Sequence, residues 1–325
     1  MPAPHPTENP SSLSRIIGSF RCGEAGLAYG IGAAWLGRGG LAAEAVAKDA
    51  SVLSQAYELG FRYFDTSAKY GESEIVVGHF LAGMRSVRES LFVATKSDIP
   101  EALSPGEARS YVLANLEASL RRLRTDYVDL FQIHDVYALD QVTAEDGVLP
   151  ALRQARDEGK IRCIGMATRP LDLLERSVSE HLVDSVLTYS DYTPIDQSAD
   201  PLVRLGVSEG IAVINGSPLS AGLLAGLDPR TIQVPEWHEE SVVRRKLAAE
   251  VYDLCARHGV PILSAALQYP LRRPDIAMNL TGPQSAEELK STLDALRQPL
   301  PDAFWLELDQ WNDDRIQSKK VGNEA

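Results

Sequence analysis

The sequence has few cysteines, an excess of acidic over basic residues, and no long apolar run. Its three cysteines, Cys22, Cys163 and Cys255, lie far apart and form no CxxC pair, which argues against a disulfide framework or a zinc ribbon. Lys and Arg number 32 against 45 Asp and Glu, a formal net charge of −13 without a dense basic run. Neither nucleic acid nor an anionic membrane surface is therefore an expected partner.

No stretch approaches the roughly 18 apolar residues of a membrane span, and the proline-rich N-terminus has no apolar core. We therefore expect no secretory signal, a partly flexible leader over residues 1–22 and a cytoplasmic protein. The 44% hydrophobic content is that of a globular chain. The 325 residues permit two domains of typical size or one (β/α) barrel, which needs about 250 residues.

Short apolar runs alternate with helical patterns along the chain. Four successive runs end near residues 65, 96, 134 and 165, in steps of 31, 38 and 31 residues, and a β-α-β unit has about that length. This spacing predicts a parallel sheet, and eight runs in one uninterrupted alternation favour a closed (β/α)8 barrel over an open sheet. The predicted strands are Leu27–Ile31, Tyr63–Asp65, Leu91–Thr95, Tyr127–Ile133, Arg162–Met166, Ser185–Thr188, Ala212–Asn215 and Ala277–Leu280.

Nothing in the sequence divides the chain in two. The first strand lacks a following G-x-G-x-x-G turn, which weakens the Rossmann alternative, and no linker is present. We therefore predict a single α/β domain over residues 1–325. The interval Ser217–Ile276 predicts a loop and a long helix, Glu240–His258, as an excursion after the seventh strand, where a lid would lie. Residues 301–325 predict an amphipathic C-terminal tail that frays.

Four polar residues lie at the ends of three successive predicted strands. Asp65 ends the second strand and Tyr70 follows it, Lys96 ends the third, and His134 ends the fourth. Because catalytic groups of a parallel barrel project from the carboxyl ends of its strands, we expect these side chains to converge. Each one alone has an ordinary structural explanation, but four at three successive strand ends are hard to reach by chance.

The chemistry of this set follows from its charges. A phenol has a pKa of about 10, and a nearby ammonium lowers it, so we expect Lys96 to lower the pKa of Tyr70. Asp65 would hold Lys96 in place, and His134 would orient a substrate oxygen. Together these groups can move a proton on or off an alcohol or carbonyl oxygen. They supply no electron acceptor, so redox chemistry would require a cofactor.

The segments around these residues resemble the aldo-keto reductase family. They are GFRYFDTSAKYGESE (60–74), VATK (93–96), DYVDLFQIHD (126–135) and GKIRCIG (159–165). The resemblance covers roughly residues 27–296 and implies a (β/α)8 barrel that binds a nicotinamide dinucleotide and needs no metal. It implies that Tyr70 is the acid/base, Lys96 tunes it, Asp65 pairs with Lys96, and His134 orients the substrate.

The resemblance also implies a cofactor site. SPLSAGLL (217–224) resembles the family's loop after the seventh strand, and GPQSAEEL (282–289) resembles its C-terminal cofactor segment. NADP-preferring relatives place Lys or Arg in the latter to meet the 2′-phosphate, whereas this chain has Glu287 and Glu288 there, so we predict NAD over NADP. The implied cofactor-binding residues are Thr168, Ser217, Leu219, Gly222, Leu224, Gly282, Gln284 and Glu288.

Three residues depart from the family pattern. Ala167 and Thr168 replace the Ser-Asn that grips the nicotinamide amide in many relatives, and Gly216 replaces an aromatic that stacks on the ring. Trp35 lies where the family often has a substrate-pocket aromatic, and with His134 it is the predicted substrate-binding residue.

Three further segments are similar to the sugar 1-dehydrogenases that act on L-galactose, L-fucose (D-threo-aldose) or D-arabinose. They are residues 164–172, 187–192 and 235–238. The similarity implies oxidation of the anomeric C1 hydroxyl of an aldose to the lactone.

Other functions stay open at this point. The chain could reduce aldehydes or ketones, or oxidise a non-sugar alcohol such as pyridoxal. A non-catalytic nucleotide-sensing barrel is a third option, against which the intact tetrad speaks. The expected partner is a small sugar or carbonyl compound; the pocket walls are expected among loops 38–42, 137–141 and 233–239, and the oligomeric state is not determined.

Overall fold

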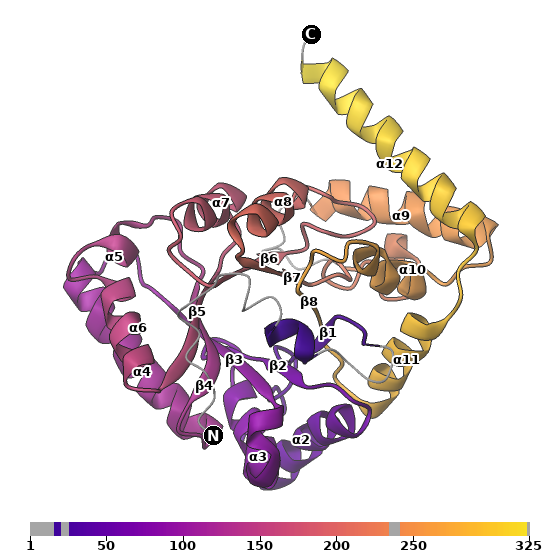
Figure 1. Ribbon diagram of the computed structural model, residues 1–325. Coiled ribbons are helices and arrows are strands. Elements are labelled where there is room, and N and C mark those ends of the chain that lie inside the picture. Colours follow the sequence, from indigo (N-terminus) through magenta and orange to yellow (C-terminus); the bar gives the residue numbers. More distant parts are fainter. Residues whose placement is uncertain (1–15, 21–25, 234–240, 324–325) are drawn as a thin grey trace.

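The computed structural model is a closed parallel β-barrel surrounded by helices (Figure 1). It describes residues 16–20, 26–233 and 241–323. Each strand pairs with the next, and the last pairs with the first, so the sheet has no open edge. This confirms the predicted (β/α)8 barrel.

The eight predicted strands all form, with ends shifted by at most about three residues. They are β1 (Tyr29–Gly32), β2 (Tyr63–Asp65), β3 (Phe92–Asp98), β4 (Val128–His134), β5 (Ile161–Ala167), β6 (Ser185–Tyr189), β7 (Ala212–Gly216) and β8 (Met278–Thr281). Helices cover the outer face of the barrel, and side chains fill its interior. Both faces of each strand are therefore buried, which is why the strands are continuous apolar runs without alternation.

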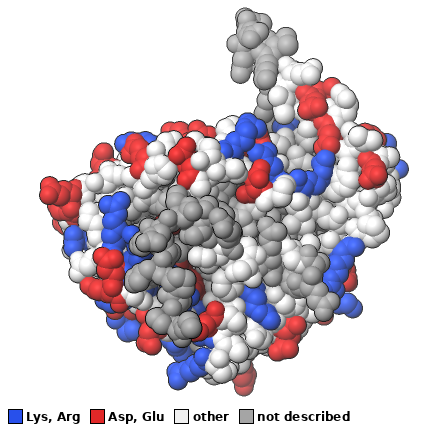
Figure 2. All heavy atoms as spheres, viewed as in Figure 1, with Lys and Arg blue, Asp and Glu red and all other residues white. Residues whose placement is uncertain are grey.

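The helices follow the strands in regular order. They are α2 (Ala43–Glu58), α3 (Ser73–Gly83), α4 (Pro105–Leu123), α5 (Asp140–Thr143), α6 (Val148–Asp157), α7 (Leu171–Ser179), α8 (Asp200–Glu209), α9 (Ser241–Arg257), α10 (Ile262–Gln268), α11 (Ala286–Arg297) and α12 (Asp302–Asn323), with 3-10 turns η1 (Arg85–Ser90), η2 (Pro229–Thr231) and η3 (Tyr269–Arg272). Across the described ranges, no helix has the length and apolarity of a membrane span. Figure 2 shows acidic and basic side chains mixed around the periphery of one face.

The predicted excursion is present after β7. A loop and η2 lead to α9, which replaces the predicted helix Glu240–His258 with bounds one residue shorter at each end. The proposed pocket wall at 233–239 and the sugar-dehydrogenase-like stretch 235–238 fall almost wholly outside the described residues.

The structure describes part of the N-terminal leader and most of the C-terminal tail. Ile17 is fully buried and Phe20 packs 5.4 Å from the ring of Phe92, so this part of the predicted leader closes one end of the barrel. In the C-terminal tail, α12 continues to Asn323 and its far end extends beyond the barrel (Figure 1). Phe304 of α12 is fully buried against the barrel.

Candidate active site

The structure brings the four predicted catalytic residues together on three adjacent strands. Asp65 is the last residue of β2, Tyr70 lies in the loop that follows, and His134 is the last residue of β4. Lys96 lies inside β3 and not at its end, because this strand continues to Asp98. β3 pairs with both β2 and β4, so the side chains converge on one rim.

A buried ion pair lies at the centre of this group. The ammonium of Lys96 donates hydrogen bonds to Oδ1 of Asp65 and, at 2.9 Å, to the carbonyl of Thr66. Nε2 of Gln132 donates to Oδ2 of Asp65 at 3.0 Å. Both carboxylate oxygens therefore have donors, which the burial of Asp65 and Lys96 requires.

The electrostatics of the pair favour a charged lysine. Burial raises the pKa of Asp65, and Lys96 and Gln132 oppose that shift by stabilising the carboxylate. Burial lowers the pKa of Lys96, but the attraction of Asp65 and Tyr70 outweighs it and the net pKa is raised. Lys96 is consequently an ammonium at neutral pH.

Tyr70 and His134 lie next to this ammonium. Nζ of Lys96 is 5.0 Å from the centroid of the Tyr70 ring, and the rings of Tyr70 and His134 meet edge to face with centroids 5.9 Å apart. Lys96 lowers the pKa of Tyr70, as expected, but burial raises it by more, so the net pKa is raised. Burial and then Lys96 hold the pKa of His134 well below its usual range, so the imidazole is neutral.

The first group of predicted cofactor residues follows β7. Ser217, Ser220, Ala221 and Gly222 all have positive φ, at 54°, 49°, 54° and 90°, and such left-handed clusters outside glycine are typical of functional loops. Of this loop, Leu224 is fully buried in the core, which leaves no surface for a cofactor contact in this conformation.

Two more residues of the β7 loop bear on the predicted cofactor site. Leu219 is only partly buried, packed against the core. The hydroxyl of Ser220 is buried and has no hydrogen-bond partner among the described residues. Ser220 is fully buried, so its hydroxyl, like Leu224, offers no surface to a ligand in this conformation.

The second group lies between β8 and α11. A Cβ atom on Gly282 would lie 3.2 Å from Cδ1 of Trp35, so these two predicted residues are in contact range at the rim. The carboxylate of Glu288 accepts a hydrogen bond from the backbone N–H of Gln284 at 2.9 Å, and its own N–H donates to Ser285 at 3.2 Å. Glu288 therefore caps α11 and places negative charge at its N-terminus.

Thr168 lies apart from both groups, directly after β5. Its hydroxyl donates to the carbonyl of Val136 at 2.6 Å, which leaves the hydroxyl oxygen as an acceptor.

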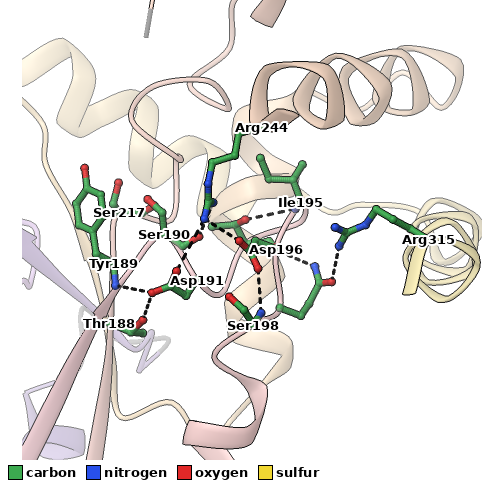
Figure 3. A network of polar contacts seen from close by, with 12 residues as sticks. Thr188, Tyr189, Ser190, Asp191, Ile195, Asp196, Ser198, Ser217, Arg244 and Arg315 are labelled. Atoms are coloured by element: carbon green, nitrogen blue, oxygen red, sulfur yellow. Dashed lines mark hydrogen bonds and ion pairs between the residues drawn. The ribbon is translucent and has the colours of Figure 1, made fainter. Parts of the chain in front are cut away.

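A polar network that the sequence did not predict supports the start of the β7 loop (Figure 3). Arg244 of α9 donates to the carbonyl of Ser190 at 3.0 Å and to Oδ2 of Asp196 at 2.7 Å. The hydroxyl of Ser190 in turn donates to the carbonyl of Ser217 at 3.3 Å. Burial raises the pKa of Asp191, which lies 3.8 Å from Arg244, to about 6.

Sequence reasoning missed Gln132 and Arg244 for different reasons. Gln132 is the only amide in the apolar run 127–133, and a polar residue inside a doubly buried strand was a usable signal. Arg244 is one of several charged residues on a surface helix, and its partners lie 48 and 54 residues away in sequence. No local pattern marks such a contact.

Comparisons with known proteins show the family of this chain. Residues 28–313 match the aldo/keto reductase family, and the chain belongs to this family. L-galactose dehydrogenase from Arabidopsis thaliana is 34% identical over 78% of this chain and 80% of its own length. D-threo-aldose 1-dehydrogenase from a Pseudomonas species is 29% identical (79% and 86%), and pyridoxal 4-dehydrogenase from Microbacterium luteolum is 25% identical (92% and 97%). Enzymes of this family use nicotinamide cofactors.

We predict that Gln132→Leu lowers kcat by about tenfold to a hundredfold with KM changed by less than about threefold, because a hydrogen bond to a buried charge is lost. Leucine is an apolar side chain of comparable volume without the amide, and circular dichroism checks the fold. Ser185→Ala is the control: it removes a buried interior hydroxyl that has no partner among the described residues. An unchanged kcat in Gln132→Leu would contradict the positioning role.

We further predict that Arg244→Ala raises the dissociation constant of the dinucleotide several-fold, measured by quenching of tryptophan fluorescence. The substitution removes the support of Ser190 and leaves Asp196 without its cation. Arg204→Ala is the matched control, since Arg204 forms an exposed ion pair with Asp200 on α8 and such pairs contribute little. Equal dissociation constants in wild type, Arg244→Ala and Arg204→Ala would refute the prediction.

Proposed function

We propose that this chain is an NAD-dependent dehydrogenase that oxidises the anomeric C1 hydroxyl of an aldose to the lactone. The observation that carries the proposal is the buried Lys96–Asp65 pair beside Tyr70, with a neutral His134 across the ring of Tyr70. The similarity to L-galactose dehydrogenase and D-threo-aldose 1-dehydrogenase supports the choice of substrate class.

The residues of the site divide the proton chemistry between them. Neutral His134 hydrogen-bonds the oxygen on C1 and orients it toward Tyr70. Tyr70, as phenolate, accepts the hydroxyl proton while the hydride leaves C1, and Lys96 stabilises the negative charge of that phenolate. Asp65 and Gln132 keep Lys96 charged and in place. Oxidised nicotinamide, when bound, accepts the hydride.

Two segments at the rim are the proposed dinucleotide site. The first is the β7 loop, whose left-handed run at 220–222 follows the partly exposed Ser217. The second is the start of α11, where a helix presents backbone N–H groups and where Glu288 already accepts from that of Gln284. Ser217, Gly222, Gly282 and Gln284 are the residues that we propose hold the cofactor, with Thr168 accepting from the carboxamide.

The arrangement of Glu288 supports NAD over NADP. Its carboxylate already accepts a hydrogen bond from the backbone N–H of Gln284 at the start of α11. A 2′-phosphate would meet this negative charge, whereas a ribose hydroxyl can donate a hydrogen bond to it.

The reducing direction is the second candidate function, favoured by the state of Tyr70. Because burial raises the pKa of its hydroxyl, Tyr70 is protonated at neutral pH and can give a proton to a carbonyl oxygen. The likeness to pyridoxal 4-dehydrogenase, which spans 92% of this chain, favours oxidation of a non-sugar alcohol instead. Assays of aldoses, pyridoxal and aldehydes in both directions separate these functions.

We predict that the wild-type enzyme forms NADH with at least one aldose in a panel of L- and D-aldoses, and that Tyr70→Phe abolishes this turnover while binding NAD. The rate of oxidation should rise with pH, because the phenol with a raised pKa must lose its proton before it accepts another. Absorbance at 340 nm (roughly the NADH maximum) measures the turnover of both proteins and its dependence on pH. Activity in Tyr70→Phe would remove the acid/base assignment, and no turnover of any aldose would remove the proposed substrate class.

We also predict that kcat/KM with NAD exceeds that with NADP by about tenfold or more, and that Glu288→Gln reduces this ratio. The physical reason is the loss of one negative charge near the 2′-phosphate position. Asp294→Asn is the control, because Asp294 lies on the same helix farther from its start. A wild-type preference for NADP would overturn the interpretation of Glu288.

A further inference from the structure

The residue that follows His134 has an unusual backbone. Asp135 has a φ of 51°, in the left-handed region that residues other than glycine rarely occupy. Its N–H donates to the carbonyl of Ala167 at the end of β5, at 3.0 Å, which holds the turn in place. Asparagine and aspartate tolerate this conformation best, so the backbone alone does not explain a charged side chain here.

The carboxylate of Asp135 lies at the open side of the site. Oδ1 is 3.7 Å from Nε2 of His134, and Oδ2 is 3.6 Å from the ammonium of Lys69. The same ammonium lies 3.3 Å from Asp98, the last residue of β3. The Asp135 side chain keeps 35% of its surface exposed, so it is reachable by a ligand that already contacts His134.

We propose that Asp135 binds the hydroxyl on the carbon next to the reacting carbon and so selects polyhydroxylated substrates. The inference rests on the proposed function, in which His134 holds the oxygen of the reacting carbon. In a sugar the neighbouring hydroxyl is one carbon–carbon bond from the reacting carbon, and the Asp135 carboxylate lies 3.7 Å from Nε2 of His134, within reach of a group so close to the reacting carbon.

The chemistry of the group sets the selectivity. An ionised carboxylate is an acceptor only, so it takes a hydroxyl donor and gains nothing from a methylene. Lys69 balances part of its charge, and the neutral imidazole of His134 does not compete for the carboxylate as a cation would. A site built to hydrogen-bond a hydroxyl discriminates strongly against the analogue that lacks it.

The test compares two aldehydes that have three carbons each, glyceraldehyde and propanal, in NADH-dependent reduction. For wild type we expect a higher kcat/KM with glyceraldehyde. For Asp135→Asn, which keeps the shape and tolerates the left-handed backbone, we expect the ratio of the two kcat/KM values to fall by about tenfold or more. The loss should appear as a higher KM for glyceraldehyde, whereas the kcat/KM for propanal should change by less than about threefold.

A second variant and a control separate recognition from backbone strain. Asp135→Gly relieves the left-handed turn and should show the same fall in the ratio. Arg124→Gly relieves a similar turn, with a φ of 53° at the end of α4, and should leave the ratio unchanged. An unchanged ratio in Asp135→Asn, or no turnover of glyceraldehyde by wild type, would overturn the inference.

The outcomes also distinguish the inference from the proposed function. If the enzyme oxidises an aldose but Asp135→Asn leaves the glyceraldehyde-to-propanal ratio of kcat/KM unchanged, the proposed function is supported and the inference is refuted. If Asp135→Asn lowers this ratio but the enzyme oxidises no aldose, the inference is supported and the proposed function is refuted. An aldose that is oxidised faster than its 2-deoxy analogue only while Asp135 is present supports both.

Discussion

The ion pair between Lys96 and Asp65 is the interaction on which the rest of the site depends. Both groups are buried in the barrel, where an unpaired charge is costly and removal of one partner typically destabilises by about 3–5 kcal/mol. Each group therefore keeps the other ionised, with Gln132 and the carbonyl of Thr66 completing the hydrogen bonds. The fixed positive charge then acts on its neighbours: it opposes the effect of burial on Tyr70 and contributes to keeping His134 neutral.

The closed barrel tolerates unfavourable backbone at one rim. Left-handed residues other than glycine follow three of the strands: Asp135 after β4, Ser190 after β6, and Ser217, Ser220 and Ala221 after β7. Each such residue costs about 1–3 kcal/mol unless the surroundings determine it. Here the ladder of eight paired strands and the bonds from Arg244 and Ser190 hold the turns in place. Most left-handed residues thus lie at the rim of the candidate site, whereas Arg124 and His181 follow helices. Ile17 and Phe20 pack at the ends where strands begin.

The sequence by itself determined the barrel and the members of the tetrad. The repeat of about one β-α-β unit and the continuous apolar runs are local patterns, and burial on both faces of each strand produces them. Asp65, Lys96 and His134 were found because they interrupt such runs where strands were expected to end. Glu287 and Glu288 lie in the first turn of α11, a helix that was visible in the sequence.

Only the tertiary structure decided the contacts that connect distant segments. Gln132 and Asp65 are 67 residues apart, and Arg244 and Ser190 are 54 apart, so no periodicity relates them. The pKa of Tyr70 is raised and not lowered because desolvation depends on how completely the neighbours enclose it. The position of Asp135 beside His134 follows from one left-handed residue held by β5. Periodic burial is a property of one segment and appears in the sequence, whereas pair geometry and desolvation are properties of the packed chain and appear only when it has folded.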